Sequence, residues 1–108
     1  MNNVYMYRLH APRPDFSTGM TPDEAEIMRQ HAGFWAGLMA EGKVLVFTPV
    51  QDPVGDWGMA IVLADDFQTV DGYSRSDPAV LSGMMTHSVL ALPFAITPDR
   101  IAAVSEGF

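Results

Sequence analysis

The sequence of 108 residues contains no cysteine and few basic residues. A chain without cysteine forms no disulfide and has neither a thiolate metal site nor a cysteine nucleophile. Six Lys and Arg residues against 13 Asp and Glu residues give a formal net charge of -7 at pH 7. Because nucleic acids and anionic membranes bind positively charged patches, this composition disfavours both kinds of partner.

Long apolar runs are absent as well, since no stretch of about 18 uninterrupted apolar residues occurs. The segment MNNVYMYRLHAPRPDF lacks a charged leader followed by an apolar run. These absences predict a soluble cytoplasmic protein without a membrane span or a targeting segment. The hydrophobic content of 48% suffices for a core. We therefore expect one domain over 1–108, with its core at about 4–96 and a tail at 97–108 that forms a helical turn or covers a partner subunit.

Four segments have the composition of β-strands. Residues 4–10, VYMYRLH, are aromatic and β-branched, with bulky groups on both faces, which predicts a central strand. Further strands are predicted at 43–50, 57–64 and roughly 85–95. The Pro, Gly and Asp residues between the second and third segments predict a loose hairpin.

Two segments predict helices. Thr21, Pro22 and Glu24 form a Thr-x-x-Glu capping box with proline at the first helical position, so a helix of about 20 residues is expected to begin at about residue 22. Gly42 is its predicted stop. A shorter helix is expected from Asp66 onward, because an acidic first turn suits the helix dipole.

The order strand, helix, strand, strand, helix, strand predicts an α+β fold of the ferredoxin-like βαββαβ type. Such a fold has a four-stranded antiparallel sheet with both helices on one face. The strands also carry apolar residues on the other face, which one layer of helices leaves uncovered. Pairing two sheets covers this surface, so we expect a homodimer with the architecture of a dimeric α+β barrel.

His31 lies near the centre of the apolar stripe of the long helix. It is either a core histidine that one hydrogen-bond partner satisfies, or an imidazole that faces a pocket and acts as general base or acid. The opposite side of the helix carries Gly33 and Gly37, each of which costs roughly 1 kcal/mol relative to Ala. This side either approaches another surface closely or faces solvent.

Asp77 precedes Pro78, a pair that commonly caps a short helix. The same carboxylate is a candidate to orient the His31 imidazole and stabilise its charged form. Geometry separates the alternatives: a separation within about 3.2 Å beside a cavity favours catalysis. A His31 that bonds only a backbone carbonyl, with no cavity nearby, favours a structural role.

Other residues are candidates for binding a substrate. Arg8 and Arg13 suit an anionic substrate, because a guanidinium pairs bidentately with a carboxylate. Tyr7, Phe34 and Trp35 are candidates for the wall of an apolar pocket.

The sequence predicts neither a metal site nor a cofactor. His10 and His87 are the other two histidines, but no His-x-x-x-His or Glu-x-x-His spacing occurs. Glycine-rich nucleotide loops and the Gly-x-Ser-x-Gly elbow of serine hydrolases are also absent. We therefore expect a small-molecule partner without nucleic acid, membrane, metal or cofactor.

Over nearly its whole length the chain resembles the YCII-related (YciI-like) family. The matching segments are YMYRLHAPRPDF, MTPDEAEIMRQHAGFWAGLMAEGKVL and SDPAVLSGM, in this order. The resemblance implies a dimeric ferredoxin-like α+β fold and an active site made by a His and an Asp, here His31 and Asp77. The chemistry linked to the family includes dehydrochlorination of a chlorinated aromatic intermediate. One departure is Thr48-Pro49, where family members often have Gly-Pro, and Thr48 is a candidate to place a hydroxyl in the pocket.

These observations lead to three hypotheses. The first is a cofactor-independent enzyme of the lyase or isomerase type, in which His31 moves a proton on a small, partly apolar substrate and Asp77 orients the imidazole. The second is a non-catalytic dimeric module that binds a small ligand or supports a partner protein. The third, a haem-degrading or cofactor-free monooxygenase, rests on fold analogy alone.

Overall fold

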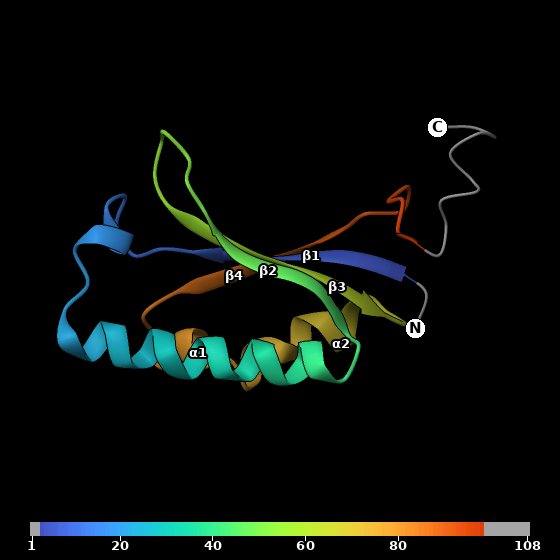
Figure 1. Ribbon diagram of the computed structural model, residues 1–108, viewed down its shortest axis with the longest axis horizontal. Coiled ribbons are helices and arrows are strands. Elements are labelled where there is room, and N and C mark those ends of the chain that lie inside the picture. The colour runs from blue at the N-terminus through green and yellow to red at the C-terminus, as the bar shows by residue number, and fades with distance from the viewer. Residues whose placement is uncertain (1–2, 99–108) are drawn as a thin grey trace.

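The computed structural model of the chain describes residues 3–98. It contains one antiparallel sheet with strand order β2-β3-β1-β4, and the helices pack on one face of it (Figure 1). This is the predicted ferredoxin-like arrangement, with the first strand in the interior of the sheet. Its elements are β1 (Asn3–His10), α1 (Pro22–Ala40), β2 (Val44–Val50), β3 (Trp57–Ala64), α2 (Phe67–Gly72), α3 (Pro78–Leu81) and β4 (Thr86–Ala91), with 3-10 turns at Phe16–Thr18 and Tyr73–Arg75.

The predicted capping box begins α1. The Thr21 hydroxyl accepts the backbone N–H of Glu24, and the Glu24 carboxylate accepts the backbone N–H of Thr21. The helix ends at Ala40, and Gly42 follows with φ of +79°, a conformation that glycine adopts without strain. Both ends of α1 therefore follow from local sequence chemistry.

Other boundaries differ from the prediction. The last strand covers only Thr86–Ala91, because the chain turns at Pro93, which has no backbone N–H to continue a ladder. The helix after Asp66 ends at Gly72 and continues as a 3-10 turn. The predicted tail lies almost entirely outside the described residues.

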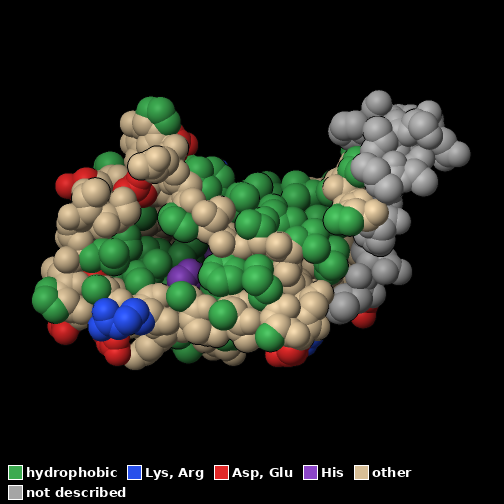
Figure 2. Space-filling view, in the orientation of Figure 1, with side chains coloured by type: hydrophobic (Ala, Val, Ile, Leu, Met, Phe, Trp, Pro, Cys, Tyr) green, Lys and Arg blue, Asp and Glu red, His purple; other side chains and the backbone are tan. Residues whose placement is uncertain are grey.

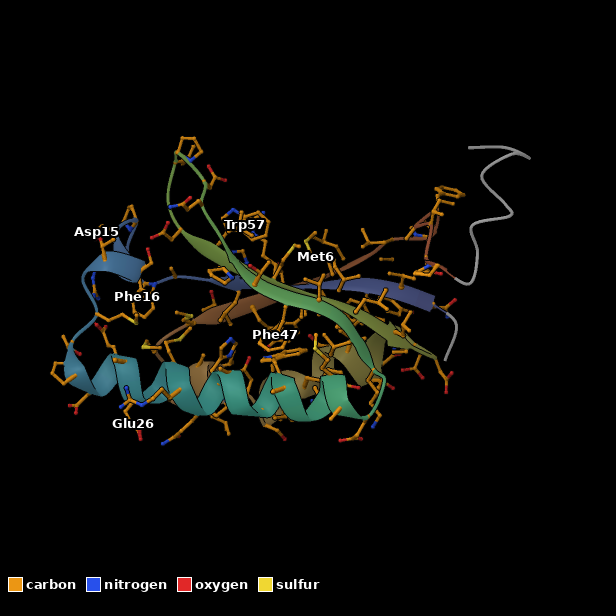
Figure 3. The ribbon with its side chains drawn as sticks, in the orientation of Figure 1. Met6, Asp15, Phe16, Glu26, Phe47 and Trp57 are labelled. Carbon is orange, nitrogen blue, oxygen red and sulfur yellow. The ribbon has the colours of Figure 1, made fainter. Side chains whose placement is uncertain are left out.

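Strand register gives the sheet two different faces. Tyr5, Tyr7 and Leu9 of β1 point toward the helices and are buried, while Met6 and Arg8 alternate with them on the other face. Figure 3 shows Met6 on the side of the sheet away from α1, and Phe47 of β2 between the sheet and α1. We call the side without helices the open face.

The outer side of α1 faces solvent. Gly33 and Gly37 are exposed, and a Cβ atom added to either would meet no described atom within 4 Å. Within residues 3–98 the structure thus favours the solvent-facing interpretation of these glycines. None of the helices in this range is long and apolar enough to cross a membrane.

Candidate functional site

Asp77 is fully buried between the sheet and the helices, and four hydrogen bonds hold its carboxylate. Oδ1 lies 2.8 Å from Nδ1 of His31 and accepts the backbone N–H of Ala79 at 3.0 Å. Oδ2 accepts the Tyr7 hydroxyl at 3.2 Å and the Trp35 indole N–H at 3.1 Å. One carboxylate therefore connects β1, α1 and α3, and it caps α3 while it contacts the imidazole.

This environment keeps Asp77 ionised. Burial raises the pKa of the carboxyl group, but the hydrogen bond and charge of His31 outweigh it, aided by the bonds from Trp35 and Ala79, so the pKa of Asp77 lies below its ordinary value. Burial, together with the charge of Asp77, raises the pKa of Tyr7 far above its ordinary value. Tyr7 therefore remains a protonated donor to the carboxylate.

The Asp77 carboxylate fixes the imidazole of His31. An ionised carboxylate only accepts hydrogen bonds, so Nδ1 of His31 carries a proton. In the neutral ring Nε2 is then the unprotonated nitrogen, which is the form that acts as a general base. The 2.8 Å separation satisfies the geometric condition for this role.

His31 opens onto an apolar cavity of about 270 Å³ between α1 and the sheet. Figure 2 shows a hollow with mainly hydrophobic walls in which a histidine side chain is visible. The lining includes the strand residues Leu9, Phe47 and Ala60 and the helix residues Met28 and Trp35. The side chain of His31 is 16% exposed, so most of the ring is packed while part of it remains accessible.

The structure brings some predicted binding residues to the cavity. Tyr7, Trp35 and Thr48 are among its lining residues. In addition to lining the cavity, Tyr7 and Trp35 both donate a hydrogen bond to the carboxylate of Asp77.

The side chain of Thr48, however, shares the open face with its β3 partner Met59 and with Arg8, and its hydroxyl donates to the carbonyl oxygen of Pro49 at 2.9 Å. The predicted placement of this hydroxyl in the pocket is therefore wrong.

Arg8, Arg13 and Phe34 lie outside the cavity lining. Arg8 belongs to the open face, where its guanidinium carbon lies 4.1 Å from the centre of the Trp57 ring. Arg13 donates to both carboxylate oxygens of Glu24 at 2.7 and 2.9 Å, a pairing that lowers the pKa of Glu24 to about 2.

Phe34 packs behind the site. Its ring contacts Trp35 edge-on, with the ring centres 5.4 Å apart. Phe34 thus supports the wall that Trp35 provides.

Sequence reasoning missed the part of the cavity that the loop after β1 builds. Phe16 is 4% exposed and, with Ser17 and Met20, lines part of the cavity. The loop is tied to the β2-β3 hairpin, because the Asp56 carboxylate accepts the hydroxyl and backbone N–H of Ser17. The available signal was an aromatic residue in a loop whose neighbouring residues are mostly Pro, Gly and polar types.

No group of three His, Asp or Glu residues within 3–98 is arranged to hold a metal ion. Models of known protein families and curated protein sequences give no match to the chain.

Proposed function

We propose that this protein is a small enzyme that transfers a proton on a small apolar substrate, as lyases and isomerases do. The observation that carries the proposal is a buried, ionised Asp77 that is 2.8 Å from His31 at an apolar cavity. The resemblance of the sequence to the YCII-related family supports it, and we propose membership of that family. A pair with only a structural role would not require a cavity beside the imidazole.

In the proposed reaction, Nε2 of His31 takes a proton from a carbon atom of the substrate. The electron pair of the broken C–H bond then forms a double bond. In an elimination, the leaving group departs from the neighbouring carbon with its own bonding pair, and the imidazolium then releases its proton to water. In an isomerisation, the π pair of an existing double bond of the substrate shifts to a more distant atom, which then takes the proton from the imidazolium. Asp77 stabilises the imidazolium that exists between these steps.

The experiment combines binding and proton exchange. A panel of small cyclic compounds is screened by thermal shift, because specific binding raises the melting temperature. Compounds that bind are incubated with the protein in D2O, and C–H exchange or turnover is followed by NMR. We expect His31→Gln to reduce exchange by about 100-fold or more while binding persists.

His87→Gln is the matched control, because His87 lies outside the cavity lining and is expected to leave exchange within about threefold of the wild type. Wild-type exchange that persists in His31→Gln would contradict the assignment of the base. Binding without any exchange or turnover in the wild type would instead support the alternative of a ligand-binding module.

We also propose that the open face joins two copies into a homodimer. On this face Val46 and Leu90 are 39% and 49% exposed, and Met6 lies between their strands. Exposed apolar patches of this kind mark association surfaces.

Leu90→Asp is expected to shift the mass measured by light scattering from dimer to monomer. Leu81→Asp, at an exposed position of α3, is the control and should leave the mass unchanged.

A further inference from the structure

The charges around the cavity bear on which molecules can enter it. Within the described part of the chain, three lining residues have ionisable side chains: Tyr7, His31 and Asp56. Tyr7 stays neutral because its pKa is raised. No Lys or Arg lines the cavity. Behind the imidazole lies the buried carboxylate of Asp77. The site therefore has carboxylates at two points and no permanent cation.

Neither of the two arginines that suited an anionic substrate lines the cavity. Arg13 donates to Glu24 and to the carbonyl oxygen of Gly19 at 2.6 Å. The guanidinium of Arg8 lies over the ring of Trp57 on the open face, and although Trp57 is a lining residue, Arg8 itself does not reach the cavity. The buried Nε of Arg8 has no hydrogen-bond partner among the described residues. A carboxylate that entered the cavity would lose its hydration shell without gaining a guanidinium partner, and the charge of Asp56 would repel it.

Asp56 is held in a fixed position at the cavity. Its carboxylate accepts the hydroxyl and backbone N–H of Ser17, while its own backbone N–H donates to the carbonyl oxygen of Pro14 at 3.0 Å. Gly55 beside it has φ of +158°, and an added Cβ would lie 3.2 Å from Pro14. The β2-β3 hairpin and the loop after β1 are therefore in close contact at the Asp56 carboxylate.

We propose that the cavity selects an uncharged apolar compound of the size of one or two six-membered rings and discriminates against its carboxylate analogue. A cavity of roughly 150 Å³ holds benzene, so about 270 Å³ accommodates a substituted ring or two fused rings. Apolar walls supply the affinity, and Asp56 supplies the discrimination. This inference rests on the proposed function in assigning the cavity as a substrate site.

The test uses two matched pairs of probes, phenylacetamide with phenylacetate and 2-naphthylacetamide with 2-naphthylacetate. Binding is followed by NMR through the indole N–H of Trp35, a lining residue. At neutral pH each amide is expected to bind about 10-fold more tightly than its carboxylate. Equal affinities, or tighter binding of the carboxylates, would overturn the inference.

Asp56→Asn removes the charge while retaining an oxygen that accepts from Ser17. It should tighten binding of the carboxylates by about 3- to 10-fold and leave the amides within about twofold. Asp15→Asn, an exposed acidic residue of the same loop, is the control for net charge and should change neither. If Asp56→Asn leaves the discrimination intact, the role of Asp56 is refuted.

These outcomes are independent of the proton-transfer test. Loss of exchange in His31→Gln with no discrimination by charge would refute this inference alone. Clear discrimination by charge with unchanged exchange in His31→Gln would refute the proposed function alone.

Discussion

Within residues 3–98, two histidine–aspartate pairs contact Tyr7, and they have the same contact distance. Nδ1 of His31 is 2.8 Å from Asp77, and Nε2 of His87 is 2.8 Å from Asp71. Tyr7 contacts both pairs, since its hydroxyl donates to Asp77 while its ring stacks on His87 with the ring centres 5.3 Å apart. Distance alone therefore does not distinguish the two pairs.

Their surroundings do. The side chain of Asp71 is 43% exposed, whereas that of Asp77 is 0% exposed and receives four hydrogen bonds. An exposed ion pair contributes little, because water solvates both partners and competes for them. A buried carboxylate depends on every donor that replaces its water. His31 also lines the cavity and His87 does not. Burial of the carboxylate and access to a cavity, rather than a short contact, distinguish the His31–Asp77 pair from the His87–Asp71 pair.

Removing each carboxylate is expected to show the largest difference between the pairs. Asp77→Asn places an amide N–H₂ among groups that donate to the carboxylate, which leaves buried donors unpaired and lowers the free energy of unfolding by about 2–4 kcal/mol. Asp71→Asn should lower it by less than about 1 kcal/mol. Urea unfolding of both variants at pH 7 measures the two values, and equal losses would show that burial of Asp77 has no energetic importance.

The second largest expected difference between the two pairs is their effect on stability at low pH. The pKa of Asp77 is lowered in the folded protein, whereas an unfolded Asp takes up its proton at about pH 4. Its contribution to stability is therefore present above that pH and is lost as the pH falls through the folded pKa. Stability is measured by urea unfolding between pH 6 and pH 2.

Asp77→Asn should lose less stability over this range than the wild type does. Asp71→Asn is the control for removing one carboxylate, and Glu24, whose pKa is lowered to about 2 by the Arg13 bond, is retained in every variant. An acid response of Asp77→Asn as steep as that of the wild type would contradict the assignment.

Much of the fold followed from local signals in the sequence. The capping box at Thr21, the glycine after α1 and the strand compositions predicted the elements and their order, because each signal acts within a few residues. The length of β4 was overestimated, since strand composition continues past the point where pairing ends. Periodicity likewise placed His31 on the inner side of α1 but left its role open.

The cavity depended on contacts distant in sequence. Asp77 and Tyr7 are 70 residues apart, and no local pattern indicates that they bond. Arg8 and Arg13 were sensible candidates for an anionic substrate by residue type. Their positions follow instead from strand register, which puts Arg8 on the open face, and from the Glu24 carboxylate, which engages Arg13.

Tyr7→Phe is expected to have the smallest effect and to show how far the two pairs are independent. The change removes one donor to Asp77 and retains the ring that stacks on His87. Because the Trp35 indole still bonds Oδ2, unfolding should become easier by about 1–2 kcal/mol, and the pKa of Asp77 should rise. Urea unfolding and the pH dependence of the Asp77 carboxyl carbon signal measure these changes.

Tyr5→Phe is the matched control for this experiment, because Tyr5 lies on the same strand and face and is also buried. It should leave the pKa of Asp77 unchanged. Proton exchange by Tyr7→Phe should stay within about threefold of the wild type, since the bond between Asp77 and His31 does not involve the phenol. A loss as large as that expected for His31→Gln would instead place the Tyr7 hydroxyl among the groups that act on the substrate.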